Sequence, residues 1–315
     1  MGKVAFLFPG QGSQTVGMGK TLAESDETVK SFFVKADERL NFPLSSLIFE
    51  GPQEELTLTT NAQPALLTTS VAILEFFKQS GIHPDYVAGH SLGEYTALVA
   101  AGAFSFEDGV YAVRKRGEFM EEAVPNGEGS MAAVLGLDRD KLAAVTLEIT
   151  NEGHPVQLAN LNCPGQIVIS GSKQGVELAA VKAKEAGAKR VMPLVVSGPF
   201  HSELMKPAAE KFKGILNEIS VKDANIPVIA NVTANEMSSA AEIKSRLIEQ
   251  LYSPVLWEDS VQKMISLGVD TFIEIGPGKV LSGLVKKIDK TVRIYAVSDK
   301  ETCLEVIESL KEESL

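Results

Sequence analysis

Ser91 stands in a setting that is typical of a catalytic nucleophile. Residues 89–93 read Gly-His-Ser-Leu-Gly, a G-x-S-x-G pattern that follows a short apolar run and precedes a helical one. The glycines permit a sharp turn from strand to helix, which lifts the serine hydroxyl out of the sheet. The new helix also directs its free N–H groups toward the atom that the serine attacks. The bare pattern also occurs as a structural glycine turn, but this context favours a nucleophile.

A nucleophilic serine needs a base, and the chain contains four histidines. His83, beside Pro84 in a polar connection, and His154, in a predicted turn, are expected at the surface. His90 flanks the serine, so its side chain should leave the backbone in another direction; a packing role is favoured over a place in the pocket wall. His201 lies where a predicted strand gives way to a predicted helix, in the kind of loop where the sites of α/β sheets form. His201 is therefore the best candidate base, with a helix-capping role as the alternative.

A glycine loop near the N-terminus offers a way to stabilise negative charge. Residues 10–14 read Gly-Gln-Gly-Ser-Gln and follow the first predicted strand directly. A phosphate-binding loop is excluded because the G-x-G-x-x-G spacing and the Walker lysine are both missing. We therefore expect an oxyanion hole, in which the backbone N–H groups of Gln11 and of Leu92, the residue after the nucleophile, bind the substrate oxygen.

Arg116 is the most informative charged residue. In the helix predicted over residues 106–123, Arg116 lies on the apolar stripe, whereas Arg114 and Lys115 point away from it and are expected in solvent. A buried arginine needs a partner because an unpaired buried charge is very costly. That partner could be an internal acid such as Glu94, in a structural ion pair. It could also be the carboxylate of a substrate, which a guanidinium group binds through two parallel hydrogen bonds.

The pattern of apolar runs predicts the elements that position these residues. We expect strands at residues 4–8, 86–89, 227–231 and 271–275, and helices at 64–78, 92–101, 106–123, 202–218, 241–251 and after 276–278. Pro64 is expected in the first turn of its helix. Strands that alternate with helices imply a mostly parallel sheet that is covered on both faces.

The middle of the chain has a different order of elements. Strands are expected at residues 130–135, 156–161, 167–170 and 190–196, with helices at 138–149 and 174–186. This βαββαβ order is ferredoxin-like. We therefore expect a small ferredoxin-like domain at residues 127–196, inserted into a large α/β domain formed by residues 1–126 and 197–315.

The bulk composition excludes several classes of function. The 315 residues include 30 basic and 41 acidic ones, which gives a net charge of −11. This balance argues against non-specific binding of nucleic acids or anionic membranes. No apolar run is long enough for a membrane helix or a signal peptide. Cys163 and Cys303 lie far apart without metal-ligand spacing, so we expect no metal site or disulfide, a structural role for Cys163, and a cytoplasmic location.

These residues together resemble the malonyl-CoA:acyl carrier protein transacylases of bacterial fatty-acid synthesis. The resemblance extends over nearly the whole chain, and the number of ordered matches makes it specific. It rests on the motifs FPGQGSQ (8–14), TNAQPAL (60–66), GHSLGEYTALVAAG (89–102), VRKRGEFM (113–120), ANLNCPGQIVISG (159–171), SGPFHSELM (197–205), QLYSPVLW (250–257) and IEIGPGKVL (273–281).

The resemblance implies an α/β-hydrolase-like large domain with an inserted ferredoxin-like domain, in agreement with the pattern above. It implies that Ser91 is the nucleophile and His201 the base. It also implies that Arg116 binds the malonyl carboxylate and that Gln11 is an oxyanion-hole donor. In this family a backbone carbonyl, rather than a third acidic side chain, orients the histidine, and Gln250 occupies the matching position.

Further positions match the substrate pocket of the family. Gln63, Asn160 and Asn162 match pocket positions of less defined role. Phe200 precedes the histidine, as in relatives that take malonyl units, whereas relatives specific for methylmalonyl units have a serine there. The resemblance therefore implies a malonyl pocket with Phe200 in its wall.

The implied reaction has two steps. His201 deprotonates Ser91, which attacks malonyl-CoA and releases CoA; the phosphopantetheine thiol of acyl carrier protein then attacks the malonyl-serine ester. No metal or redox cofactor is needed, and we expect a monomer. Acyl carrier proteins are acidic, as this chain is, so a local basic patch is expected, with Lys279, Lys286 and Lys287 as candidates.

Two other interpretations stay open at this point. A serine hydrolase would share the elbow motif, but it would leave Arg116 unexplained and would release malonate quickly without a thiol acceptor. A non-catalytic acyl-CoA-binding subunit would share the fold, but the intact Ser91 and His201 argue against it. Formation of an acyl-enzyme would separate these alternatives.

Overall fold

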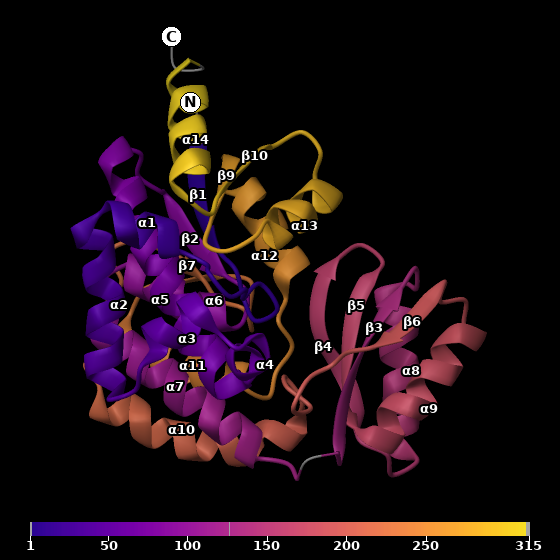
Figure 1. Ribbon diagram of the computed structural model, residues 1–315. Helices are drawn as coiled ribbons and strands as arrows, with labels where there is room; N and C mark the ends of the chain where they lie inside the picture. The colour runs from indigo at the N-terminus through magenta and orange to yellow at the C-terminus, as the bar shows by residue number, and fades with distance from the viewer. Residues whose placement is uncertain (1, 126, 313–315) are drawn as a thin grey trace.

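Two sheets organise the part of the chain that the computed structural model describes, residues 2–125 and 127–312 (Figure 1). The larger sheet contains six strands and the smaller sheet four. In spatial order, the large sheet consists of β10 (Arg293–Val297), β9 (Val269–Ile275), β1 (Lys3–Phe8), β2 (Tyr86–Gly89), β7 (Val228–Ile229) and β8 (Glu236–Met237). Every neighbouring pair is parallel except β7 with β8. The predicted, mostly parallel sheet is therefore confirmed.

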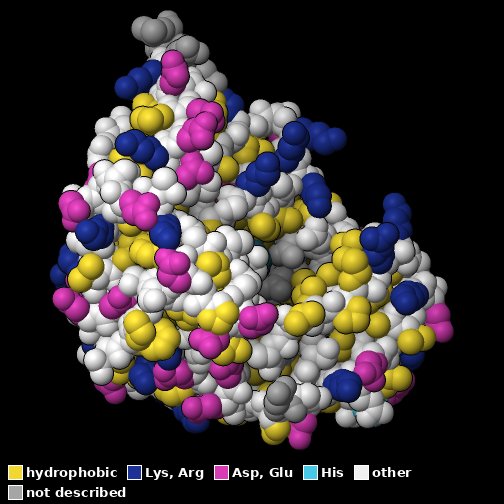
Figure 2. Space-filling view, in the orientation of Figure 1, with side chains coloured by type: hydrophobic (Ala, Val, Ile, Leu, Met, Phe, Trp, Pro, Cys, Tyr) yellow, Lys and Arg dark blue, Asp and Glu magenta, His cyan; other side chains and the backbone are white. Residues whose placement is uncertain are grey.

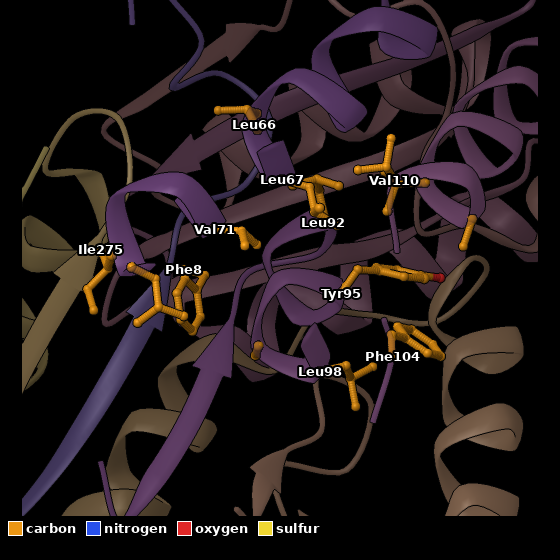
Figure 3. Packing of buried hydrophobic residues seen from close by; sticks show 14 of the residues in the cluster. Phe8, Leu66, Leu67, Val71, Leu92, Tyr95, Leu98, Phe104, Val110 and Ile275 are labelled. Carbon is orange, nitrogen blue, oxygen red and sulfur yellow. The ribbon is translucent and has the colours of Figure 1, made fainter. Parts of the chain in front are cut away.

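Helices cover both faces of this sheet (Figure 1). Along β1, Phe6 and Phe8 pack into one hydrophobic core, and Ala5 and Leu7 pack into another on the opposite face. The alternation follows from the two-residue period of a strand. Figure 3 shows part of the first core around Phe8. The helices of the large domain are α1 (Lys20–Ser25), α2 (Glu27–Leu40), α3 (Leu44–Glu50), α4 (Gln53–Thr57), α5 (Thr59–Phe77), α6 (Leu92–Ala100), α7 (Phe106–Glu122), α10 (Lys206–Glu218), α11 (Ala240–Gln250), α12 (Trp257–Ser266), α13 (Val280–Ile288) and α14 (Lys300–Glu312), with short 3-10 turns η1 (Lys78–Ser80) and η2 (Glu203–Met205).

The small domain has the predicted βαββαβ order. Its elements are β3 (Gly129–Leu135), α8 (Arg139–Asn151), β4 (Val156–Cys163), β5 (Gln166–Ser172), α9 (Lys173–Glu185) and β6 (Arg190–Pro193). The strands lie in the order β4-β5-β3-β6, and every pair is antiparallel. The first and third strands are therefore central, which is the ferredoxin-like arrangement. Asp138 caps α8, since its side chain accepts from the N–H groups of Asp140 and Lys141.

Backbone hydrogen bonds join the small domain to the large one. The N–H of Val255 donates to the carbonyl of Ala159 at 2.8 Å, and the N–H of Leu161 donates to that of Val255 at 2.9 Å. The division at residues 127–196 stays a prediction, and its expected boundary residue 126 lies outside the described residues. Within residues 2–125 and 127–312, no helix combines the length and the apolar character needed to cross a membrane.

The expected position of Pro64 is wrong. Helix α5 begins at Thr59, so Pro64 is its sixth residue rather than a member of its first turn. Proline has no N–H to donate to the carbonyl of Thr60. The Nη1 of Arg114 donates to that carbonyl instead, at 3.2 Å, and to Asn61 Oδ1 at 2.7 Å. Arg114 is therefore half-buried and joins α7 to α5, which corrects the expectation that it lies in solvent.

Candidate active site

The turn between β2 and α6 presents Ser91 as the sequence predicts. Ser91 has φ 51° and ψ −105°, a backbone conformation that a non-glycine residue rarely adopts. A Cβ atom on Gly89 would lie 1.9 Å from the carbonyl carbon of Gly93, and one on Gly93 would lie 2.1 Å from the carbonyl oxygen of Phe8. Only glycine fits at either position, so both glycines are needed for the tight crossing of the turn over β1.

His201 lies beside the serine. Its Nε2 is 2.8 Å from Ser91 Oγ, and its Nδ1 is 2.8 Å from the backbone carbonyl oxygen of Gln250. Burial, and then the neighbouring Arg116 cation, lower the pKa of His201 to about 3, so the ring is neutral at physiological pH. A neutral ring that donates from Nδ1 to the Gln250 carbonyl leaves Nε2 free to accept the serine proton. This geometry suits a general base.

His201 lies at the site, but it does not follow a strand of the parallel sheet, as the sequence predicts. The preceding strand β6 ends at Pro193 rather than Val196, and it belongs to the small antiparallel sheet. The histidine is not placed by the edge of the parallel sheet. Its N–H donates to the carbonyl of Leu251 at 3.2 Å, and Gln157 Nε2 donates to its carbonyl at 3.2 Å. The end of α11 and strand β4 therefore hold it.

Arg116 projects from α7 to the same point. Its Nη2 donates to Ser91 Oγ at 3.0 Å and to Gln250 Oε1 at 2.9 Å, while its Nη1 donates to Gln63 Oε1 at 2.8 Å. The side chain is only 1% exposed. Within the described chain, no carboxylate lies within ion-pair distance of it. The structural ion pair with Glu94 is therefore not formed, and the buried cation has only neutral partners.

The glycine loop after β1 passes directly over the nucleophile turn. A Cβ atom on Gly10 would lie 2.5 Å from the carbonyl oxygen of His90. Gln11 and Leu92 both line the cavity above Ser91. No described residue accepts a hydrogen bond from the backbone N–H of Gln11 or of Leu92. A free donor at the start of α6 and a second one in the loop after β1 are the arrangement expected of an oxyanion hole.

These residues line a cavity of about 500 Å³. The surface is hollowed between the large and the small domain (Figure 2), and the wall includes residues of both. Asn160 and Phe200 contribute to it. Gln63 and Asn162 are not among the residues that line it. Gln63 Oε1 accepts from Arg116 Nη1, and Asn162 Oδ1 is 2.8 Å from His90 Nε2. The predicted contact of Gln63 and Asn162 with the substrate stays a prediction.

Comparison with known proteins decides the family. The family described as acyl transferase domain matches residues 5–311. The chain belongs to the acyl transferase family. Within it, the chain is 67% identical over 314 residues to the malonyl CoA-acyl carrier protein transacylase of Bacillus subtilis (strain 168), a match that covers 100% of this chain and 99% of the relative. The predicted family and the predicted acyltransferase activity are confirmed.

Solved structures give the same result. An acyl carrier protein S-malonyltransferase from Vibrio cholerae superposes on this acyltransferase with a TM-score of 0.94 at 47% identity, over 96% of this chain and 99% of that chain. A malonyl-transacylase solved in complex with its type II PKS acyl-carrier protein has a TM-score of 0.94 at 43% identity, over 98% and 99% of the two chains. The predicted fold class, an α/β large domain with a small inserted domain, is confirmed.

The acyltransferase contains one site residue that sequence reasoning missed. Asn231 Oδ1 accepts from the N–H of Ser91 at 2.7 Å. The strand expected at residues 227–231 is shortened to β7, because the N–H of Ala230 donates to the carbonyl of Asn235 and that of Asn231 to Glu94. Strand β7 pairs with β2 in parallel. The carboxyl end of the strand predicted at 227–231, where Asn231 stands, therefore lies beside the nucleophile turn that follows β2. That adjacency is the signal that could have identified Asn231.

Other reactive groups of the acyltransferase lie apart from the serine. Cys163 and Cys303 are free and buried, and burial raises the pKa of both thiols. His83 is exposed, and His154 is half-buried in the small domain. In the described ranges, no cluster of three or more His, Cys, Asp or Glu side chains is arranged to hold a metal ion.

Proposed function

We propose that this acyltransferase moves a malonyl group from malonyl-CoA to the phosphopantetheine thiol of an acyl carrier protein, through a malonyl-serine at Ser91, and thereby supplies fatty-acid chain elongation. The observation that carries the proposal is the place of Arg116. Its guanidinium is buried, has no anionic partner among the described residues and lies 3.0 Å from the nucleophile oxygen. A substrate carboxylate beside the reacting carbonyl would supply the missing charge.

The first step acylates the enzyme. The Ser91 hydroxyl gives its proton to His201 Nε2, and its oxygen attacks the thioester carbonyl carbon of malonyl-CoA. The N–H groups of Gln11 and Leu92 bind the oxyanion that forms. The carbon–sulfur bond then breaks, and the CoA sulfur leaves with the proton held by His201. Gln250 keeps the histidine in the required tautomer through its backbone carbonyl.

The second step runs the same route in reverse. The carrier thiol gives its proton to His201, its sulfur attacks the malonyl-serine carbonyl carbon, and Ser91 leaves with the proton. Every step uses groups of the protein alone, so we propose that no metal or redox cofactor takes part. Two free, buried thiols suit a reducing compartment, so we propose a cytoplasmic location. We also propose that the enzyme is a monomer.

We propose that Phe200 limits the size of the acyl pocket. It is 6% exposed and lines the cavity next to His201. In Phe200→Ser, the space that opens should accept an α-methyl group, and the ratio of kcat/KM for methylmalonyl-CoA to that for malonyl-CoA should rise. One methyl group is worth ~1–3 kcal/mol, so the rise should be about tenfold to a few hundredfold. An unchanged ratio would place the pocket wall at other residues.

We propose that the carrier protein docks on the lysine rim, defined as Lys279, Lys286 and Lys287. All three side chains are exposed, and none forms an ion pair with a carboxylate of the described residues. Figure 2 shows Lys and Arg side chains gathered over α13, at the margin of the hollow. A Cβ atom on Gly278 would lie 4.0 Å from the Cβ of Ser13, so the rim adjoins the loop over the nucleophile. An acidic carrier would bind such a surface by charge complementarity.

Transfer of malonyl groups to acyl carrier protein tests the proposed function, and variants of the lysine rim test the proposed docking surface. The Lys279→Glu and Lys286→Glu double variant should raise KM for acyl carrier protein by about tenfold, because rim charges steer association. Transfer to a small pantetheine thiol should not change. Lys213→Glu, an exposed lysine of α10, is the matched control and should behave as wild type. An unchanged KM for the carrier in the double variant would contradict docking on the lysine rim. Absence of malonyl transfer by the wild-type enzyme would contradict the proposed function itself.

A further inference from the structure

A buried polar network joins the nucleophile to the arginine, and the mechanism above leaves most of it unused. It consists of Glu94 on α6, Asn231 after β7 and Gln250 at the end of α11. Their side chains are 1%, 0% and 0% exposed. Buried polar groups of this kind are retained when each atom has a partner. Asn231 and Gln250 bond the backbone of Ser91, Gln250 also bonds Arg116, and Glu94 bonds Asn231 and Gln250.

Asn231 clamps the backbone of the nucleophile turn. Its Oδ1 accepts from the N–H of Ser91 at 2.7 Å, and its Nδ2 donates to the carbonyl of Gly89 at 2.7 Å. A side-chain amide offers a donor and an acceptor on one planar group, so Asn231 can bond both backbone groups at once. The strained Ser91 conformation persists only where its surroundings hold it. The clamp therefore sets the direction in which the serine oxygen and the Leu92 N–H point.

Gln250 contacts Ser91, Arg116 and His201. Its Nε2 donates to the carbonyl of Ser91 at 3.0 Å, and its Oε1 accepts from Arg116 Nη2 at 2.9 Å. Its backbone carbonyl accepts from His201. The hydrogen bond between Arg116 and Gln250 therefore forms only while the Gln250 amide presents its oxygen, not its nitrogen, to the guanidinium.

Glu94 bonds the backbone of Asn231 and the side-chain amide of Gln250. Its Oε1 accepts from the backbone N–H of Asn231 at 3.1 Å, and its Oε2 accepts from Gln250 Nε2. Burial raises the pKa of Glu94 to about 8, and these donors oppose the rise because they stabilise the charged form. Each carboxyl oxygen faces an N–H donor, so the NH₂ of Gln250 points toward Glu94 and the amide oxygen of Gln250 points toward Arg116.

We propose that Glu94 is a positioning residue that holds the Ser91 turn through Asn231 and aims Arg116 through Gln250. Glu94 touches neither the substrate nor the reacting atoms. It makes the nucleophile and the carboxylate anchor depend on one buried group, so that acylation and selection of a carboxylate-bearing acyl group are coupled. The inference rests on the proposed function, because it assigns Arg116 to the substrate carboxylate.

The test is Glu94→Gln, which keeps the shape of the side chain. An amide has one oxygen, so one of the two donors, the Asn231 N–H or Gln250 Nε2, must face an NH₂ group. Loss of one hydrogen bond in a charged network corresponds to about tenfold. We expect kcat/KM for malonyl-CoA to fall by about tenfold or more relative to kcat/KM for acetyl-CoA. Glu94→Asp, which keeps the charge but loses reach, should lower the ratio less and replaces Glu94→Gln if that variant does not fold.

Glu274→Gln is the matched control. Glu274 is 0% exposed, and its oxygens accept from the N–H groups of Leu281 and Ser282 at 3.0 and 2.7 Å, outside the site. This variant should lower the melting temperature and leave the malonyl-to-acetyl ratio unchanged. A Glu94→Gln enzyme that also loses only stability would overturn the positioning role. Failure of the wild-type enzyme to form a malonyl-serine would contradict the proposed function. This outcome differs from a Glu94→Gln enzyme with an unchanged malonyl-to-acetyl ratio, which would contradict only the positioning role.

Discussion

An Arg116→Ala enzyme should lose transfer of malonyl groups by about a hundredfold to several thousandfold, while transfer of acetyl groups holds steady or improves. The malonyl carboxylate would enter a desolvated site without its partner, and removing one partner of a buried ion pair costs about 3–5 kcal/mol. Acetyl-CoA has no carboxylate to leave unpaired. The measurement is kcat/KM for both thioesters.

Arg114→Ala is the matched control for this prediction, because it removes another arginine of the same helix. Arg114 bonds the carbonyl of Thr60 and the side chains of Asn61 and Glu118, and it does not line the cavity. Its loss should lower the melting temperature and reduce both activities equally, if at all. Parallel losses for malonyl and acetyl transfer in Arg116→Ala would assign Arg116 to the scaffold.

A Ser91→Ala enzyme should retain its fold and lose transfer by a factor on the order of 10⁴ to 10⁶, as when the nucleophile of a catalytic unit is removed. The backbone bonds of Ser91 to Asn231 and Gln250 do not involve the hydroxyl. Binding of malonyl-CoA, measured by calorimetry, should persist because Arg116 remains. Cys163 offers no substitute nucleophile, because it is 1% exposed and burial raises its thiol pKa. Substantial residual turnover would contradict the role of Ser91.

The sequence predicts most accurately those parts of the site that depend on local pattern. The apolar run at residues 86–89 and the G-x-S-x-G pattern define β2, the turn and the start of α6, and all three lie where expected. The order of elements in the small domain was also readable, because each element is bounded by glycine, proline or a capping residue. Asp138 is one such cap.

Tertiary contacts account for what the sequence did not reveal. The apolar stripe of α7 indicated that Arg116 is buried, but Gln63 and Gln250 come from other helices, so no local pattern names them as its partners. Glu94 could pair with Arg116 by residue type, but it binds the backbone N–H of Asn231 and the side-chain amide of Gln250 instead. Pro64 shows the same limit, since the carbonyl freed by proline in α5 is bonded by Arg114 from α7.

Intact-mass analysis of the enzyme after mixing with malonyl-CoA, with peptide mapping of the adduct, tests the central claim most directly. We expect one malonyl group per chain, located on the peptide that contains Ser91 and absent from Ser91→Ala. The adduct should persist in buffer and disappear when acyl carrier protein bearing a free phosphopantetheine thiol is added. Rapid release of malonate without a thiol would indicate a hydrolase. An adduct on another residue such as Cys163, or no adduct at all, would contradict the account.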